Sequence, residues 1–508
     1  MKILAALGSC LVLIGAVTDP LSASERLTPA SLFSDHAVFQ QDQPVPVWGR
    51  GRPGAAVTIS CRGQSVAAIA GADGRWKATL APMPADASGA DVVISTNPGE
   101  SITLHDVVVG QVWLASGQSN MELPLSRAKD AATEIAAADL PLVRELRVER
   151  SPSDAPAETA PTSGWRVAGP ATAGDFSAVG FFFARALAAR LKVPVGIIHS
   201  SWGGTEIESW LAEPVLRRTR AWPGFEQRWQ EELKTFPQRK AGYPALDEAW
   251  RRQEADWAAT GKPITLPWPH PPVGPGTAYA SGALFNGMIL PVAPYAIRGF
   301  LWYQGESNVG RSGEYAELLS AMIRDWRKQW GGGDRPFYLV QLPNYSNGHP
   351  GGRDWAELRE AQSRVLALPD VAMAATIDAG DANDLHPKDK RPVGERLALI
   401  AESQAYGLPG EWSGPVFQSA TRDGAAMRVR FSRAAGLNIH GTATAFEVAG
   451  ADRGFHSATA LVDDRSVVVS SPEVAEPVAV RYAWTNAPAA SLFNDAGLPA
   501  APFRSDDW

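Results

Sequence analysis

One serine in this chain stands where a nucleophile is expected. The apolar run 107–115 ends before Gly117, which permits a tight turn directly ahead of the hydroxyl of Ser119. Enzymes of the α/β hydrolase class present a catalytic serine at such a strand-to-helix turn. An ordinary β-to-α turn with a serine N-cap has the same signature. The interpretation of Ser119 as a nucleophile therefore depends on other segments.

A nucleophilic serine needs a general base. The histidines outside the β-rich flanks are His199, His270, His349 and His386. His386 follows the apolar run 371–377, and Asp384 lies two residues before it. A carboxylate that holds an imidazole in one tautomer is what activation of a serine requires. We therefore expect His386 to be the base, although a histidine in a polar loop can also be a plain surface residue.

Two other segments place hydrogen-bond donors directly after apolar runs. The first follows the run 193–199 and contains Gly203 and Gly204, whose main-chain N–H groups could face an oxyanion. The second begins with Gln304, whose side-chain amide could donate in the same way. Because ligands of parallel sheets bind beyond the carboxyl ends of the strands, we expect these donors beside Ser119. A simple glycine turn would also explain the first segment.

The sequence offers no pattern that binds a catalytic metal. It contains no H-E-x-x-H, no C-x-x-C and no closely spaced histidine pair, so we expect neither a metal nor another cofactor. Glu306 and Asp384 could form the carboxylate pair of a glycosidase. We favour a different interpretation, in which Glu306 is a buried carboxylate that accepts hydrogen bonds from N–H groups at a strand end. The charged run 388–391 indicates a solvated helix start and not a binding patch.

Composition limits the classes of partner. The chain has 508 residues and a formal net charge of −7, which argues for more than one domain and against a nucleic-acid or anionic-membrane partner. Its 18 tryptophans are many for this length; most should be core, and some suit sugar rings. Trp268 and His270, in a proline-rich loop, could touch a substrate, or the loop could be a rigid linker.

The two ends of the chain and its centre differ in their pattern of predicted strands and helices. Residues 1–23 have the charged start, apolar stretch and small-residue cleavage site of a signal peptide, so we expect an exported, periplasmic or extracellular protein without a membrane span. Short alternating strands in 24–105 and 411–508 predict two β-sandwich domains. Strands alternating with helices in 106–410 predict an α/β domain with a parallel sheet, interrupted by a polar insertion at about 211–280.

Export also bears on the cysteines. Cleavage would remove Cys10 and leave Cys61 as the single thiol, so the mature chain cannot form an internal disulfide. Cys61 lies in a strand-like run, and we expect it to be a buried apolar residue rather than a reactive one.

Four motifs, taken in order, resemble one known family. They lie at 117–122, 202–205, 302–307 and 384–387, and they are similar to the motifs of the sialate O-acetylesterase family. The resemblance also takes in 284–289 and 493–500, so it covers nearly all of the mature chain. It implies a serine esterase of the SGNH or GDSL type with a flavodoxin-like sheet.

Residue roles follow from this resemblance. It implies Ser119 as the nucleophile, His386 as the base and Asp384 as its partner. It implies an oxyanion site formed by the N–H of Ser119, by Gly203 or Gly204, and by Gln304. Other residues of the same motifs that we expect to contact substrate are Gln118, Asn120, Trp202, Glu306 and Asn308. In the wider superfamily, the carboxylate that partners the histidine lies three residues before it, and this chain has Asn383 at that position. We therefore expect either Asp384 or a main-chain carbonyl to orient the ring of His386.

The expected function is the removal of acetyl groups from sialic acid, with an acetylated carbohydrate as the partner molecule. An acetylesterase for xylan or xyloglucan would use the same chemistry, since relatives of this family also deacetylate plant-wall polymers. A non-catalytic carbohydrate-binding protein, in which the β-sandwiches bind the sugar, is the alternative from a different class. The sequence leaves the sugar, the acetyl position and the oligomeric state open.

Overall fold

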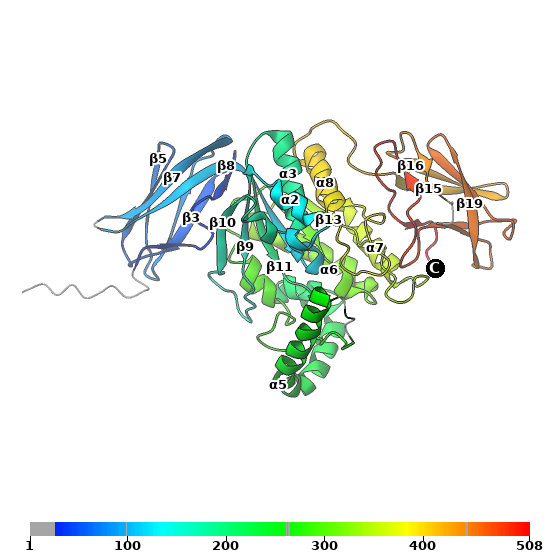
Figure 1. Ribbon diagram of the computed structural model, residues 1–508, viewed down its shortest axis with the longest axis horizontal. Coiled ribbons are helices and arrows are strands. Elements are labelled where there is room, and N and C mark those ends of the chain that lie inside the picture. The colour runs from blue at the N-terminus through cyan, green and yellow to red at the C-terminus, as the bar shows by residue number, and fades with distance from the viewer. Residues whose placement is uncertain (1–25, 98, 261, 263–264, 442–444) are drawn as a thin grey trace, which may run out of the picture.

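The computed structural model describes residues 26–508, except 98, 261, 263–264 and 442–444. The predicted signal peptide and Cys10 lie outside the described residues. Three parts follow one another along the long axis of the molecule (Figure 1): a β-rich N-terminal lobe, a central α/β part and a β-rich C-terminal lobe. The mixed α/β class expected from the sequence is therefore confirmed.

Strand β8, Ser101–Gly117, joins the N-terminal lobe to the centre. Its first half pairs antiparallel with β7, Asp86–Thr96. Its second half pairs parallel with β11, Val195–Ser201, on one side and with β12, Gly299–Tyr303, on the other. Every residue from 107 to 117 is buried, as expected for a strand covered on both faces. The domain boundary predicted at 105/106 falls inside this continuous strand.

The N-terminal lobe contains two sheets. One sheet has the order β1-β3-β6. In the other, β4 lies between β5 and β7, β7 pairs with β8, and β2 also pairs with β8. These strands are β1 Thr28–Pro29, β2 Val38–Gln40, β3 Val45–Arg50, β4 Ala56–Cys61, β5 Gln64–Ile69 and β6 Arg75–Leu80. Strand β6 alternates exposed and buried residues along its length, the pattern of a sheet with one solvated face. Cys61 is buried in β4, as predicted.

The central sheet has the order β10-β9-β11-β8-β12-β13-β14. All neighbours in it run parallel except the edge strand β10, which confirms the predicted parallel sheet. The strands not yet named are β9 Leu140–Val148, β10 Thr162–Ala168, β13 Phe337–Val340 and β14 Val371–Ala374.

Helices cover both faces of this sheet. On one face the ring of Trp113 in β8 packs on Phe183 of α3, Ala178–Leu191, with ring centroids 5.3 Å apart. On the other face Trp302 in β12 packs on Trp326 of α6, Ser312–Gln329, at 5.5 Å. Helix α8, Arg391–Ile400, packs beside α3, and α7, Asp354–Arg364, beside α6.

Short helical turns connect these elements. They are α1 Ser119–Glu122, η1 Leu125–Arg127, α2 Ala131–Ala136, η2 Ala173–Asp175, η3 Ile207–Trp210, η4 Phe285–Ile289, η5 Glu306–Asn308, η6 Val365–Ala367 and η7 Ala401–Ala405. Two of them, α1 and η5, directly follow the central strands β8 and β12 and carry motif residues.

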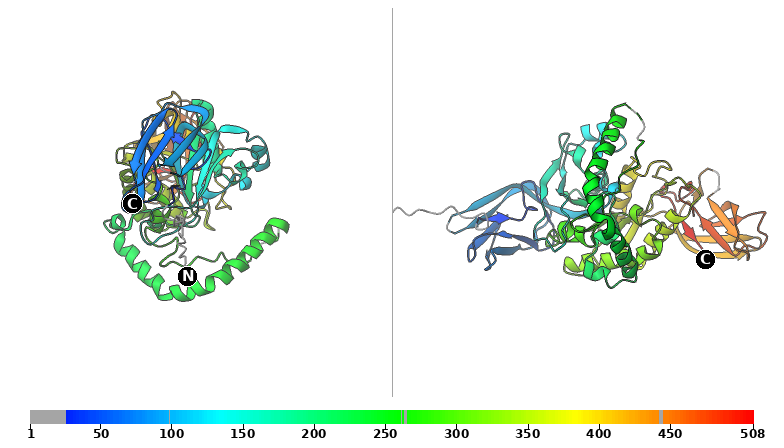
Figure 2. Two further views of the ribbon diagram at one scale, coloured as in Figure 1. Left: turned by 90° about the vertical axis from the view of Figure 1, so that its left-hand side faces the viewer. Right: turned by 90° about the horizontal axis from the view of Figure 1, so that it is seen from below.

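The insertion after η3 contains the short helix α4, Glu213–Leu216, and the 39-residue helix α5, Trp222–Thr260. Pro237 and Pro244 lie inside α5, where a proline removes a helical hydrogen bond and bends the axis. Figure 2 shows α5 as an arc that stands away from the rest of the protein. None of the helices in the described part of the chain combines the length and the apolar character needed to cross a membrane.

The C-terminal lobe is a seven-stranded antiparallel sheet of order β15-β16-β20-β19-β18-β21-β23, with a small pair β17-β22 beside it. The strands are β15 Val416–Asp423, β16 Ala426–Ser432, β17 Asn438–Ile439, β18 Phe446–Ala449, β19 Phe455–Asp463, β20 Ser466–Ser470, β21 Ala479–Tyr482, β22 Leu492–Phe493 and β23 Phe503–Arg504. This lobe has its own core, separate from the core that the N-terminal lobe shares with the centre.

A buried arginine fastens the C-terminal lobe to the centre. Arg359 of α7 is fully buried, and its guanidinium donates to the carbonyls of Leu342, Pro343, Thr485 and Asn486 at 2.7–2.9 Å. Burial lowers the pKa of Arg359 to about 9. The C-terminal lobe is thus attached to the α6/α7 side of the central sheet through main-chain carbonyls.

Candidate active site

The end of strand β8 presents Ser119 at the carboxyl edge of the central sheet. Gly117 has φ +138°, and a Cβ on it would lie 2.1 Å from the main-chain oxygen of Tyr303 at the end of β12. Only glycine fits this approach, which lets the chain turn into α1. Ser119 is the first residue of α1 and is partly exposed, whereas its neighbours Gln118 and Asn120 are buried.

The structure brings Ser119 and His386 together. Nε2 of His386 lies 2.8 Å from Oγ of Ser119, a hydrogen-bond distance between residues that are 267 positions apart. His386 stands in the loop between β14 and α8. Burial is the largest cause that lowers its pKa, the positive charge of Lys390 lowers it further, and Asp384 opposes both. A neutral imidazole that faces a hydroxyl can take its proton.

Asp384 contacts the main chain of the histidine and not its ring. Oδ1 of Asp384 accepts the main-chain N–H of His386 at 2.8 Å. Within the described part of the chain, Nδ1 of the His386 ring has no hydrogen-bond partner. The exposed Asn383 donates its main-chain N–H to Asp381, and among the described residues its side chain makes no hydrogen bond to the His386 ring. Asp384 therefore fixes the loop and acts on the ring through its charge.

The expected oxyanion donors differ in availability. The N–H of Ser119 lies in the first turn of α1, where main-chain N–H groups have no helical acceptor, and the N–H of Gly204 meets no acceptor among the described residues. The N–H of Gly203 instead donates to Oε2 of Glu122 at 2.8 Å. Glu122 in turn accepts from Arg150. Of the two glycines, Gly204 has the free donor.

Gln304 is engaged inside the protein. Its Nε2 donates to the carbonyl of Thr205 at 3.1 Å and to Oδ1 of Asn308 at 2.8 Å, and its Oε1 accepts from Tyr315 at 2.8 Å. The side chain is fully buried, and a buried amide has to satisfy its polar atoms in this way. The expectation that Gln304 donates to an oxyanion therefore differs from the arrangement seen, in which both amide protons are already used.

Three of the residues expected to contact substrate are buried among protein partners. Gln118 accepts the main-chain N–H groups that follow β12, at 3.3 and 3.4 Å. Asn308 accepts the N–H of Ile207 at 3.0 Å and donates to Glu208 at 2.9 Å. Asn120 is also fully buried. Trp202 remains partly exposed, with the Arg150 guanidinium 5.2 Å from its ring centroid.

A buried polar layer lies directly behind Ser119 and His386. Nδ2 of Asn120 donates to Glu306 at 2.5 Å and to the carbonyl of Leu385 at 3.1 Å, while Oδ1 accepts from Nζ of Lys390 at 2.5 Å. Glu306 thus accepts a hydrogen bond from an amide of the protein, and burial raises the pKa of its carboxyl. Lys390 is only 1% exposed, so the prediction that 388–391 is solvated is wrong at this position.

Aromatic side chains lie beside the loop that contains Gly203 and Gly204, here called the glycine loop. A Cβ on Gly203 would lie 3.2 Å from Cβ of Ser119, and a Cβ on Gly204 would lie 3.3 Å from the ring of Trp268 and 3.4 Å from the Tyr279 hydroxyl. Trp268 is 42% exposed. The proline-rich loop of the insertion therefore brings an exposed aromatic ring beside Gly204, next to the glycine that approaches Ser119.

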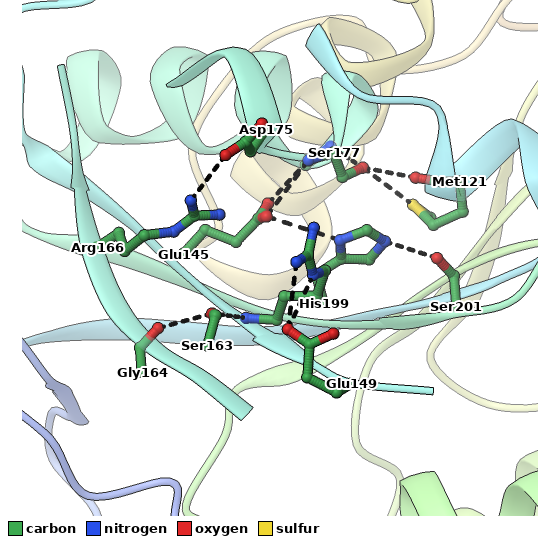
Figure 3. Close-up of polar contacts among 12 residues, drawn as sticks. Met121, Glu145, Glu149, Ser163, Gly164, Arg166, Asp175, Ser177, His199 and Ser201 are labelled. Atoms are coloured by element: carbon green, nitrogen blue, oxygen red, sulfur yellow. Dashed lines mark hydrogen bonds and ion pairs between the residues drawn. The ribbon is translucent and has the colours of Figure 1, made fainter. Parts of the chain in front are cut away.

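A second serine–histidine pair lies deeper in the sheet (Figure 3). Nε2 of His199 lies 2.6 Å from Oγ of Ser201, and its Nδ1 lies 3.6 Å from Glu145. Glu145 accepts the N–H of Ser177, whose hydroxyl donates to the carbonyl of Met121 in α1. All five residues are buried, so this second pair is not open to a substrate, and the bond from Ser177 to Met121 is the one that reaches α1.

The described residues contain no group of three or more His, Cys, Asp or Glu arranged to hold a metal ion. The polar side chains around Ser119 are instead bonded to one another. The two groups that the structure brings together at this edge of the sheet are the Ser119 hydroxyl and the His386 imidazole.

Comparisons with known proteins relate this chain to carbohydrate esterases. The model of the carbohydrate esterase family of sialic acid-specific acetylesterases matches residues 255–401. Sialate O-acetylesterase of Rattus norvegicus is 30% identical over 419 residues, which cover 74% of this chain and 73% of the rat protein. The protein of the same name in Mus musculus is 29% identical, and the match covers 98% of this chain and 97% of the mouse protein. The crystal structure of a carbohydrate acetylesterase from Xanthomonas citri is 37% identical, with a TM-score of 0.80, and covers 95% of this chain and 100% of that one. This chain belongs to the sialate O-acetylesterase family of carbohydrate esterases.

Proposed function

We propose that this protein is a serine esterase that removes acetyl groups from carbohydrates, with Ser119 as the nucleophile and His386 as the general base. The observation that carries the proposal is the 2.8 Å contact between Oγ of Ser119 and Nε2 of His386 at the carboxyl edge of the sheet. Membership of a family of carbohydrate acetylesterases supports the reaction class.

The reaction follows from these positions. Oγ of Ser119 attacks the acetyl carbonyl carbon while Nε2 of His386 takes the hydroxyl proton. The N–H groups of Ser119 and Gly204 hold the oxyanion, whereas the N–H of Gly203 is bonded to Glu122. His386 then returns the proton to the sugar oxygen as the C–O bond breaks. Water, activated by the same imidazole, releases acetate from the acetyl-enzyme.

The strand order supports an SGNH-type, flavodoxin-like domain. Strands β11-β8-β12-β13-β14 follow the order 2-1-3-4-5, and β9 and β10 extend the sheet beyond β11. In this order the connection reverses direction between β8 and β12, and ligands bind at such a switch point. Ser119 follows β8, and the motif at 302–307 spans the end of β12 and the turn after it.

We propose O-acetylated sialic acid as the substrate, because the relatives from rat and mouse are named for that activity. A second candidate is an acetylated plant-wall polysaccharide, favoured by the likeness to a structure described only as a carbohydrate acetylesterase. Acetate release from O-acetylated sialic acid, set against acetylated xylan and xyloglucan, separates the two. The sequence pattern of residues 1–23 supports export of the chain.

The mechanism is tested with two serine variants. Ser119→Ala should fold normally and lose at least ~10³-fold in kcat on an aryl acetate, because the nucleophile is gone. Ser201→Ala is the matched control, since the hydroxyl of Ser201 also lies within hydrogen-bond distance of a histidine ring but is buried. It should keep most of the activity. If Ser119→Ala kept half of the wild-type rate, Ser119 would not be the nucleophile.

A further inference from the structure

Lys390 is the cationic residue of the buried layer, and the burial of its charge needs a special reason. It is 1% exposed at the start of α8, four positions after His386. Burial of an ammonium group is costly unless it is paired and hydrogen-bonded. Its Nζ donates to Oδ1 of Asn120 at 2.5 Å and lies 5.4 Å from the centroid of the Tyr303 ring. Its direct contacts are thus a neutral amide and an aromatic face, while the carboxylates of Glu306, Asp384 and Asp389 act on it without a hydrogen bond.

The bond from Lys390 decides which way the Asn120 amide points. Because the ammonium form of Lys390 can only donate, it holds Oδ1 of Asn120 toward itself and turns Nδ2 toward Glu306 and the carbonyl of Leu385. Asn120 follows Ser119 in the chain, and Leu385 precedes His386. One amide therefore connects the neighbours of the two reacting residues, and Lys390 fixes its orientation.

We propose that Lys390 is a positioning residue for the reaction: by fixing Asn120 it holds the Leu385 carbonyl, and through it the ring of His386, in reach of Ser119. The proposal rests on the proposed serine mechanism. A displacement of a reacting group by about 1 Å can cost on the order of 10²-fold in rate, so a device that holds the imidazole is valuable.

The charge of Lys390 has a second effect on the imidazole. The charged groups that act on His386 are Lys390, Asp384, Arg127 and Glu122. Lys390 and Arg127 disfavour the imidazolium, whereas Asp384 and Glu122 favour it. After burial, Lys390 is the largest cause of the lowered pKa of His386. Removal of this positive charge therefore raises the pKa of His386, and the base becomes protonated at a higher pH.

Lys390 itself is poised near neutral pH. Burial lowers the pKa of Lys390 to about 7, against the opposing effect of the carboxylates of Glu306, Asp384 and Asp389. On the acid side of neutrality the ammonium form prevails, which is where the imidazole would otherwise take up a proton. The charge is thus present in the pH range in which it protects the base.

The test compares Lys390→Met with Lys388→Met. Lys388 is exposed and two residues away, so its variant removes the same charge without touching the buried layer. With 4-nitrophenyl acetate, Lys390→Met should lower kcat about tenfold with little change in KM, and it should move the acid limb of kcat/KM about 0.5 to 1 pH unit upward. Lys388→Met should match the wild type in both. Equal profiles for the two variants would overturn the proposal.

Two further variants separate position from charge and cover a failure of Lys390→Met to fold. Lys390→Arg keeps the positive charge and should keep the wild-type limb, whereas Lys390→Gln keeps a donor for Asn120 but should shift the limb upward. The same wild-type limb in both would overturn the electrostatic part of the proposal. The rate of inactivation by a fluorophosphonate reports the reactivity of Ser119 without turnover, and it should fall in Lys390→Met in parallel with kcat.

The failure of this proposal is distinguishable from that of the proposed function. If Ser119→Ala is inactive and Lys390→Met behaves like Lys388→Met, the serine mechanism stands and Lys390 is only a structural residue. If Ser119→Ala remains active, the mechanism on which the proposal rests is itself wrong.

Discussion

Asp384→Asn tests how the carboxylate acts on the base. In the structure Asp384 accepts the main-chain N–H of His386 at 2.8 Å, and the asparagine side-chain oxygen can accept the same bond. The variant therefore keeps the loop and loses only the charge. That charge favours the imidazolium, so its loss lowers the pKa of His386 further and moves the acid limb of kcat/KM to lower pH. This direction is opposite to the one expected for Lys390→Met.

The size of the effect follows from the geometry. A charge within about 4–6 Å shifts a pKa by about 1–3 units, and one unit corresponds to a tenfold change in the stability of the imidazolium that forms during attack. Since no hydrogen bond joins Asp384 to the ring, we expect the low end of this range, a loss of about 10- to 100-fold in kcat.

The assay is the pH dependence of kcat and kcat/KM on an aryl acetate between about pH 5 and about pH 9. Asn383→Ala is the control, because Asn383 is exposed and uses only its main-chain N–H. If Asp384→Asn kept the rate and limb of Asn383→Ala, Asp384 would be a loop cap without influence on the base. A loss of about 10⁴-fold would refute the through-space argument, because it would require a direct bond between the carboxylate and the ring.

Three further predictions concern other parts of the molecule. Trp268→Ala should raise KM for an acetylated oligosaccharide and leave KM for a small aryl acetate unchanged, because the exposed ring borders the loop of Gly203 and Gly204. Steady-state kinetics that show equal effects on both substrates would contradict this prediction. Gly117→Ala should lower the free energy of unfolding by ~3 kcal/mol or more, or prevent folding, because the alanine Cβ would clash with the main chain of Tyr303. A thermal midpoint close to that of the wild type would show that the turn can relax. Arg359→Met should lower the unfolding free energy in urea by ~3–5 kcal/mol, because the buried carbonyls of Leu342, Pro343 and Thr485 would lose their donor, although the Asn486 carbonyl would keep the N–H of Tyr345. The exposed Arg364→Met should change little.

The sequence predicted the meeting of Ser119 and His386 because both follow strands of one parallel sheet. Apolar runs identified the strands, and the rule that the carboxyl ends of parallel strands share an edge brought the two loops together. The insertion was recognisable in the same way, from a change to polar residues and prolines at 211–280. These features depend on local pattern and on a general property of sheets, so one sequence suffices to find them.

The orientation of the polar motif residues could not be predicted from the sequence. Gln304 ends a strand at the expected edge, but its amide points to Thr205 and Asn308, which belong to other turns of the chain. Lys390 stands in a run of charges that is typical of a solvated helix start, and only the path of the loop after His386 buries it. Side-chain direction at a loop depends on distant partners, about which local spacing carries no information.

The buried layer explains why this site contains many polar residues that do not face a substrate. An imidazole and a hydroxyl at 2.8 Å need fixed supports, and the loops that carry them, after β8 and β14, do not pair with each other as strands. Side-chain amides supply the cross-links that the sheet cannot. Asn120 connects the turn of Ser119 to the loop of His386, and Gln304 connects the glycine loop to the turn after β12. Each amide is buried and fully engaged, so replacing one leaves unsatisfied polar atoms and frees a loop at the same time. Substitutions in this layer should therefore lower kcat well before they weaken substrate binding.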